Sequence, residues 1–222
     1  MTFRRARSEE QREIRRQAIL GTASSMLSDM PVSQVSLNEL SRRTGLAKSA
    51  MVRYFESREA VLLELLGTLL HSWVSEIAAE LSHETPTGSA QERVDRLAAV
   101  LSRSLQQHAV LCDLMAAQPG VLEHNVSAET LLCFWRSTYA SVARFAEAIR
   151  SFIPELDEDA HSVSVTILMT TGALWMYAQP SDSAVAAAEA EPELAVVHMR
   201  FNTDLETTLA RLITGALVKR SS

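Results

Sequence analysis

The sequence of 222 residues contains only two cysteines, Cys112 and Cys133, and they stand far apart with no C-x-x-C spacing. A disulfide framework and a cysteine-rich zinc site therefore have no support. In a reducing compartment both side chains are expected to be buried thiols, with a redox-sensing pair as the alternative.

Long apolar runs are also missing. No stretch of about 18 apolar residues lacks a charge, so the sequence predicts no membrane-spanning helix. The N-terminal residues, MTFRRARSEEQRE, are charged and contain no apolar signal core. The sequence thus predicts a cytoplasmic protein with no membrane partner.

Motifs of catalysis and cofactor binding are absent as well. The sequence contains no G-x-x-x-x-G-K-[ST], G-x-G-x-x-G, H-E-x-x-H or G-x-S-x-G pattern, the spacings typical of nucleotide, dinucleotide, zinc and serine-nucleophile sites. Its six histidines never pair at i, i+4, which leaves a metal site without support. We expect no enzymatic activity, no cofactor and no metal ion.

The net charge is −6, which taken alone argues against a nucleic-acid partner. The charge is divided unevenly, however. Residues 1–60 hold 11 Lys or Arg and 7 Asp or Glu, a net +4, so the rest of the chain carries −10. This asymmetry indicates a DNA-facing module on an acidic body. Arg4, Arg5 and Arg7 precede the first predicted helix and form either a DNA-reaching arm or a solvated tail.

The segment 36–59, SLNELSRRTGLAKSAMVRYFESRE, predicts two short helices joined by a tight turn, with a third helix beginning behind them. Ser36 and Glu39 have the spacing of a capping box, which starts the first helix. Gly45 ends that helix, because glycine adopts the left-handed conformation without steric cost. The second helix is predicted over 47–54. This is helix-turn-helix geometry, in which the second helix reads base edges in the major groove of DNA.

The pattern L-x-E-L-x-x-x-x-G-L-x-K-x-x-x-x-x-Y-F-x-S-x-E in this segment resembles the DNA-binding domain of the tetracycline-repressor (TetR) family. The resemblance covers roughly residues 12–66. It includes an upstream apolar stripe that matches the buried face of the family's first helix: Ile19, Leu20, Ala23 and Leu27. Two residues depart from the pattern. Ala47 stands where a serine-like cap is usual, and Val52 stands where a phosphate-contacting tyrosine is common.

Nine residues are predicted to contact DNA: Ser36, Asn38, Lys48, Ser49, Ala50, Val52, Arg53, Tyr54 and Arg58. Lys48 and Arg53 are cationic, and each has either a phosphate or a guanine edge as its target. Tyr54 and Arg58 are expected to hold the DNA backbone. As alternatives, Tyr54 packs inside the protein and Arg58 pairs with Glu59.

The rest of the chain shows apolar residues at helical spacing and no strand-like alternation. We therefore predict an all-α fold of about nine helices. A three-helix DNA-binding domain is expected over residues 1–56, and a helical ligand-binding and dimerisation domain over residues 57–222. Helices of the second domain are predicted at 57–81, 90–108, 109–117, 127–152, 157–178 and 193–218. The Ala-, Ser- and Pro-rich segment 179–192 is predicted to be a mobile loop.

The resemblance implies that the last two long helices form a four-helix bundle with their copies in a second subunit. The residues predicted for this interface are Val163, Ile167, Thr171, Leu174, Phe201, Leu205, Leu209 and Leu212. The alternative is a purely intramolecular core. A homodimer would read two half-sites of a palindromic double-stranded operator.

The resemblance also implies a small-molecule effector. Aromatic and methionine side chains line ligand pockets, but they are equally common in plain cores. The predicted lining is Trp73, His108, Met115, Gln118, Phe134, Trp135, Tyr139, Met169, Trp175 and Met176.

The sequence therefore predicts a ligand-responsive, homodimeric transcriptional repressor. Two other functions stay open. One is a helical small-molecule carrier or sensor whose N-terminal domain no longer binds DNA. The other is a DNA-binding regulator controlled by a protein partner.

Overall fold

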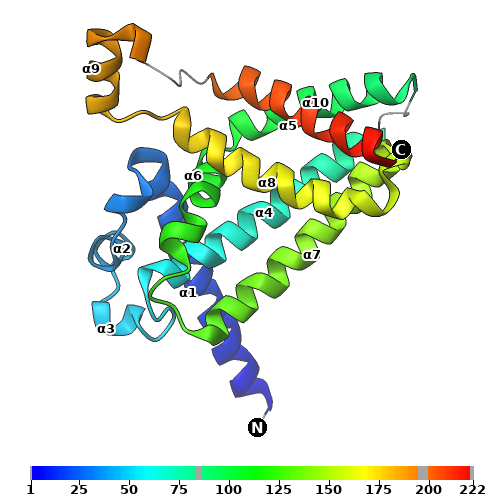
Figure 1. Cartoon of the computed structure of the whole chain (residues 1–222). Coiled ribbons are helices and arrows are strands. Elements are labelled where there is room, and N and C mark those ends of the chain that lie inside the picture. The colour runs from blue at the N-terminus through cyan, green and yellow to red at the C-terminus, as the bar shows by residue number, and fades with distance from the viewer. Residues whose placement is uncertain (1, 84–86, 195–199, 221–222) are drawn as a thin grey trace. The chain divides into compact units, whose positions relative to one another are not determined.

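The computed structural model describes residues 2–83, 87–194 and 200–220. Over these residues it contains ten α-helices and no strand, which confirms the predicted all-α fold (Figure 1). The helices are α1 (Thr2–Asp29), α2 (Leu37–Thr44), α3 (Lys48–Met51), α4 (Arg58–His83), α5 (Ala90–Gln107), α6 (Ala109–Ala117), α7 (Ala128–Phe152), α8 (Ala160–Tyr177), α9 (Asp182–Ala190) and α10 (Phe201–Arg220). Short helical turns lie at Val32–Gln34, Gln118–Leu122, Pro154–Asp159 and Pro192–Leu194.

The chain folds as two compact units. The first contains Met1–Leu69 together with Ala117–Ser137, and the second contains Leu70–Ala116 together with Thr138–Ser222. Two long helices, α4 and α7, therefore each contribute one part to the first unit and the other part to the second.

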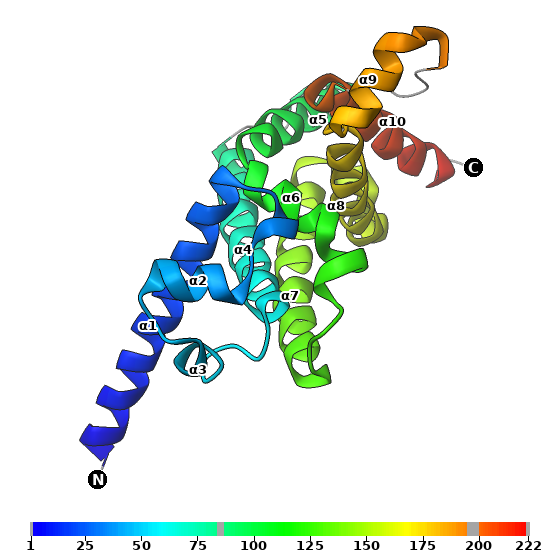
Figure 2. The same ribbon diagram turned by 90° about the vertical axis from the view of Figure 1, so that its left-hand side faces the viewer.

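The core of the first unit is built from the apolar faces of its helices. Figure 2 shows α2 lying beside α1. The four α1 residues predicted to be buried are at most 5% exposed: Ile19, Leu20, Ala23 and Leu27. Leu40 of α2, Met51 of α3 and the following Phe55 are buried as well. Burial of these apolar side chains is the main force that holds the short helices in place.

One arginine of α1 joins three parts of the first unit. Arg16 donates from Nε to Oε1 of Glu64 on α4 at 2.7 Å, and from Nη2 to the other oxygen of the same carboxylate. Its Nη1 donates to the carbonyl oxygen of Tyr54 at 2.8 Å, and its guanidinium lies 4.3 Å from the ring centroid of Phe55. Charge-assisted bonds of this kind are stronger than neutral ones. Arg16 thus connects α1, α4 and the residues that follow α3.

Arg58 fixes the connection between α1 and α2. Its Nη1 donates to the carbonyl oxygens of Ser33 at 3.3 Å and Val35 at 2.9 Å, and its Nε donates to Oε1 of Glu59 at 2.6 Å. The Glu59 side chain is only 8% exposed, so Arg58 supplies the ion-pair partner of a buried carboxylate. The pair with Glu59, one of the two roles considered for Arg58, is present in the structure.

A carboxylate attaches the N-terminus of α7 within the first unit. Glu56 accepts a hydrogen bond from the backbone nitrogen of Ser127 at 2.7 Å. The Ser127 hydroxyl accepts in turn from the backbone nitrogen of Thr130 at 3.2 Å, so both side chains cover free amides at a helix start. The bond from the Ser127 amide, together with the Thr130 hydroxyl, holds the pKa of Glu56 below its usual value.

The second unit is packed around α4, α5, α7, α8 and α10. Trp73 of α4 is fully buried, with its ring centroid 5.1 Å from that of Phe145 on α7. Its Nε1 donates to the hydroxyl of Ser104 at 3.1 Å, so the indole keeps a polar partner while its ring fills the core. Helix α10 packs along α5 and α8 (Figure 1).

A second tryptophan connects α6, α8 and α10. Trp175 of α8 packs edge-on against Phe201 at 4.7 Å between ring centroids. Its Nε1 donates to Oδ1 of Asp113 on α6 at 2.6 Å. Partial burial raises the pKa of Asp113, although the bond from Trp175 opposes this shift.

The segment 179–192 was predicted to be a mobile loop, and this prediction is wrong because the segment contains α9. The Ser181 hydroxyl accepts from the backbone nitrogen of Ala184 at 3.3 Å and so caps the helix. Alanine, the commonest residue of α9, has the highest helix propensity. None of its residues is buried.

Two helices begin later than predicted. Helix α8 begins at Ala160 rather than 157, because Asp157 has φ 43° and ψ −115°, which breaks the helical path. Helix α10 begins at Phe201 rather than 193, and residues 195–199 of the predicted start lie outside the described residues.

Two further expectations are corrected. Helix α1 begins at Thr2, so Arg4, Arg5 and Arg7 belong to the helix instead of preceding it. Cys112 is buried, and burial raises the pKa of its thiol to about 12, but Cys133 is exposed. Only one of the two cysteines is therefore a buried thiol.

Helix α4 meets the length and hydropathy of a membrane span, the one such helix among the described residues. However, 61% of its apolar window is buried inside the protein. Burial of this kind is typical of a core helix in a globular protein.

Two helical glycines provide a matched test of the packing. Gly172 of α8 is buried, and a Cβ added there would lie 3.2 Å from the carbonyl carbon and oxygen of Met115 on α6. We expect Gly172→Ala to lower the free energy of unfolding by about 1–3 kcal/mol through overpacking. Gly21 of α1 has no neighbour within 4 Å. Gly21→Ala should raise the free energy of unfolding by about 0.5–1 kcal/mol. Urea unfolding measures both, and equal effects would refute the close α6–α8 contact.

The arginines Arg58 and Arg42 provide a second matched pair. Arg58→Ala removes the partner of the buried Glu59 carboxylate and of two carbonyl oxygens, so the free energy of unfolding should fall by about 2–3 kcal/mol. Arg42 has a side chain that is 71% exposed, and Arg42→Ala should leave stability near the wild-type value. Thermal unfolding followed by circular dichroism distinguishes the two. A wild-type transition for Arg58→Ala would contradict a stabilising role of the Arg58 contacts.

Candidate nucleic-acid interface

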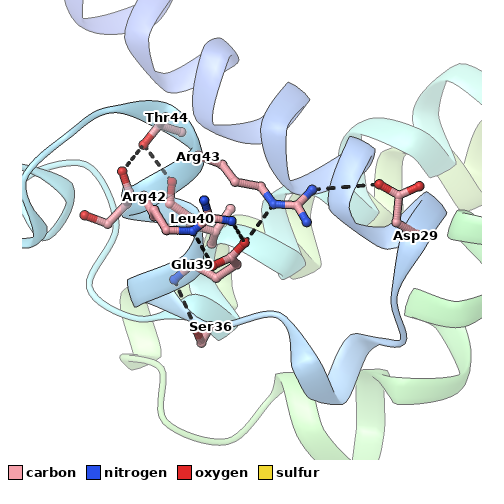
Figure 3. Close-up of polar contacts among 8 residues, drawn as sticks. Asp29, Ser36, Glu39, Leu40, Arg42, Arg43 and Thr44 are labelled. Atoms are coloured by element: carbon pink, nitrogen blue, oxygen red, sulfur yellow. Dashed lines mark hydrogen bonds and ion pairs between the residues drawn. The ribbon is translucent and has the colours of Figure 1, made fainter.

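Helix α2 starts and stops at the predicted residues. The Ser36 hydroxyl accepts a hydrogen bond from the backbone nitrogen of Glu39 at 3.2 Å, and Gly45 ends the helix with φ 68°. The reciprocal half of the predicted capping box does not form. Figure 3 shows why: the Glu39 carboxylate is bound by the guanidinium groups of Arg42 and Arg43.

These ion pairs neutralise the outer surface of α2. Arg42 donates to Glu39 at 2.5 and 2.9 Å, and Arg43 donates from Nε to Oε1 of Glu39 at 2.9 Å. Arg43 also lies 3.8 Å from the carboxylate of Asp29 (Figure 3). The bonds from Arg42 and then Arg43 lower the pKa of Glu39 to about 2. Both arginines are thus engaged within the protein.

Helix α3 is shorter than predicted. It spans Lys48–Met51, after which the backbone continues as a tighter turn in which the Tyr54 nitrogen donates to the Met51 carbonyl at 2.9 Å. Ala47 supplies no side-chain cap, because alanine has no oxygen to accept a hydrogen bond where a serine-like residue is usual. A helix of four residues has no stability of its own, so its position depends on tertiary contacts.

Met51 and Phe55 are buried, so the opposite face of residues 48–55 lies toward solvent. The exposed members of the predicted contact set are Asn38, Lys48, Ser49, Val52 and Arg53. The half-buried members are Ser36, Ala50, Tyr54 and Arg58. Val52 is 52% exposed although it is apolar.

Three residues of α1 that the sequence analysis did not single out adjoin this face. Gln11, Arg12 and Arg15 line a groove of about 590 Å³ together with Ala50, Arg53 and Tyr54. Arg12 Nη2 donates to the backbone carbonyl oxygen of Arg53 at 3.3 Å. The sequence signal was the spacing of arginines along the predicted first helix, but the spacing alone does not say which of them face α3.

The predicted ligand-pocket residues differ widely in burial. Trp73, Phe134 and Trp175 are buried, while His108, Met115 and Gln118 are half-buried. The side chains exposed in the single chain are Trp135, Tyr139, Met169 and Met176. Two polar members are already engaged. His108 Nδ1 lies 2.8 Å from the Ser104 carbonyl oxygen, and Gln118 donates to Glu123 at 3.0 Å.

The residues predicted for a dimer interface face the interior of the second unit. Those that are at most 9% exposed are Val163, Ile167, Thr171, Phe201, Leu205 and Leu209. Leu174 and Leu212 are half-buried. The Thr171 hydroxyl donates to the Ile167 carbonyl at 2.8 Å, so even the polar member is satisfied within its helix. These side chains therefore stabilise the unit itself.

Two family models and several relatives match the chain. Residues 19–65 match the family described as bacterial regulatory proteins, tetR family, and residues 68–220 match the tetracyclin repressor-like C-terminal domain. The HTH-type transcriptional regulator EthR of Mycobacterium tuberculosis is 34% identical over 79 residues, as is that of Mycobacterium bovis. The aligned stretch covers 36% of this chain and 36% of each relative, about a third of their length.

Two solved structures have a similar fold over nearly the whole chain. A TetR transcriptional regulator from Rhodococcus sp. RHA1 has a TM-score of 0.57 at 14% identity, covering 94% of this chain and 97% of that one. The fatty acid degradation regulator FadR from Bacillus halodurans has a TM-score of 0.55 at 15% identity, covering 91% and 96%. The two family matches, one of which covers more than half of the chain, show that the chain belongs to the tetracycline-repressor (TetR) family of bacterial regulatory proteins, as its sequence pattern predicted.

Proposed function

We propose that the chain is a sequence-specific DNA-binding transcriptional repressor that acts in the cytoplasm as a homodimer and responds to a small-molecule effector. The observation that carries the proposal is the exposed face formed by Lys48, Ser49, Val52 and Arg53 behind the left-handed turn at Gly45. This is the face that a helix-turn-helix inserts into the major groove. The protein acts by binding, with no catalytic step and no cofactor.

The side chains of this face divide into two roles. Arg53 has the reach and planar fork to bind O6 and N7 of a guanine, and Lys48 at the helix start suits a phosphate. Val52 contacts a thymine methyl, which gives its exposed apolar side chain a partner. Arg58 positions the connection before α2 instead of touching DNA, since its guanidinium is occupied by Glu59 and two carbonyl oxygens.

The effector acts by preferring one conformation. We assign DNA binding to residues 1–56 and effector binding and dimerisation to residues 57–222. The candidates for effector contact in the second unit are Trp73, His108, Met115 and Trp175, which are buried or half-buried there. An effector shifts the protein away from DNA only by its difference in affinity for the two conformations. Because α4 and α7 belong to both units, a change in either helix is transmitted along a continuous backbone.

The homodimer uses the outer face of α8. Five of its exposed residues recur at alternating steps of four and three, the spacing of a helix–helix seam: Ser162, Thr166, Met169, Ala173 and Met176. Met169 is 70% exposed and Met176 is 59% exposed, although both are apolar. Ala173, which lies between them on the seam, is small and allows close approach of a second copy. Two-fold symmetry of the dimer would match a palindromic operator.

Removal of the cationic side chains should weaken DNA binding. With a duplex that the wild-type protein selects from random DNA, Arg53→Ala is expected to lower affinity by about 1–3 kcal/mol and to relax the preference at one base pair. Lys48→Ala should lower affinity without changing the sequence preference. Fluorescence anisotropy measures both.

The control is Arg103→Ala, which removes the same charge from α5 of the second unit. It should bind the duplex like the wild type. If all three variants bind equally well, the exposed face of α3 is not the DNA-reading surface.

Charges placed on the outer face of α8 should separate the subunits. Met169→Glu and Met176→Glu are each expected to raise the dissociation constant of the dimer by roughly 100-fold, because an unpaired interfacial charge costs about 3 kcal/mol. Leu132→Glu, at a 46% exposed position on α7, is the control and should leave the dimer intact. Sedimentation equilibrium reports the mass. Dimeric Met169→Glu and Met176→Glu proteins, or a monomeric wild type, would contradict the proposed interface.

A further inference from the structure

The groove between α1 and the end of α3 carries a concentration of positive charge. Its lining contains three arginines, Arg12, Arg15 and Arg53, and no carboxylate. Arg12 and Arg15 are exposed and lie one turn apart on α1, so both side chains reach the same surface of that helix. Gln11 and Tyr54 add neutral polar side chains to the wall. The groove is therefore a polar, cationic concavity.

These arginines differ from the other described arginines of residues 9–60. Arg16 is paired with Glu64, Arg42 and Arg43 with Glu39, and Arg58 with Glu59. Among the residues that the structure describes, the side chains of Arg15 and Arg53 form neither a hydrogen bond nor an ion pair.

Arg12 makes a single bond to a backbone carbonyl, which holds its guanidinium at the groove and leaves other N–H groups available. The acidic residues nearest in sequence do not neutralise the groove. Glu13 accepts a hydrogen bond from Gln17 at 2.8 Å, and Glu9 and Glu10 form no ion pair within the described part of the chain. An anion is thus the complement that the groove lacks.

The position of the groove identifies the anion. Arg53 and Ala50 belong both to the groove and to the segment that we propose reads the operator, so the groove adjoins that segment. A volume of about 590 Å³ is ample for a phosphodiester group. Guanidinium forks match phosphate oxygens in a bidentate manner.

We propose that this groove binds a phosphate of the operator backbone, with Arg15 and Arg12 of α1 as the contacts. The inference rests on the proposed function, because the phosphate belongs to the DNA that α3 reads. The site lies outside the helix-turn-helix and contacts no base, so it sets the register of α3 on the duplex and carries no sequence information. Since Arg12 also holds the Arg53 carbonyl, binding of the phosphate and placement of α3 are coupled.

The test is the salt dependence of binding to the duplex selected by the wild-type protein. Loss of one phosphate contact per subunit should reduce the slope of log affinity against log salt by about 0.9 per contact. Arg15→Ala is the main variant, because its side chain makes no bond in the described structure whose loss would disturb folding. Arg15→Lys keeps the charge and should retain most of the slope. Arg103→Ala removes an equal charge from the second unit and should keep the wild-type slope.

The outcomes separate this inference from the proposed function. A reduced slope with an unchanged sequence preference for Arg15→Ala supports the phosphate site. An unchanged slope for Arg15→Ala, with weakened binding for Arg53→Ala, overturns the phosphate site and leaves the proposed function standing. A changed sequence preference for Arg15→Ala also overturns it, because the residue then reads a base. Failure of the wild-type protein to select any duplex overturns both.

Discussion

The surface that we propose faces DNA depends on the contacts that hold the residues following α3. Four helical residues cannot maintain a helix in water, and the carbonyl groups that follow them would otherwise lack partners. Guanidinium groups from α1 supply those partners: Arg12 binds the carbonyl oxygen of Arg53, and Arg16 binds that of Tyr54. Arg16 is in turn fixed by a bidentate pair with Glu64 of α4. The segment that we propose reads DNA is therefore positioned by α1 and α4 rather than by its own helical stability.

The same side-chain type serves two purposes in the first unit. Arginines that are paired with carboxylates, such as Arg58 with Glu59, hold parts of the unit together, and their charge is already compensated by the carboxylate. Arg15 and Arg53, which have no such partner among the described residues, line the groove, and Arg53 also lies on the exposed face. The division explains why the net positive charge of residues 1–60 is a poor guide to the contact surface. Pairing, which only the folded chain reveals, decides which cations remain available for DNA.

Local signals in the sequence were enough for the fold and for most of the helix-turn-helix. Ser36, Gly45 and the apolar stripe of α1 act through nearest neighbours, and the structure shows each in the expected place. Side-chain partners distant in sequence were not predictable, as Arg58 with the Val35 carbonyl illustrates. The burial of one face of α8 within the single chain was not predictable either. Apolar residues stand on both the buried and the exposed side of this helix, so periodicity could not tell the buried Ile167 from the exposed Met169.

The central claim is that the face of α3 and the adjoining groove of α1 form one DNA-binding surface. A crystal structure of the chain bound to a duplex selected from random DNA tests it most directly. The account predicts α3 in the major groove, with Arg53 at a base edge and a backbone phosphate within hydrogen-bonding distance of Arg15. A complex in which α3 lies outside the groove, with Lys48 and Arg53 in solvent, would contradict the account.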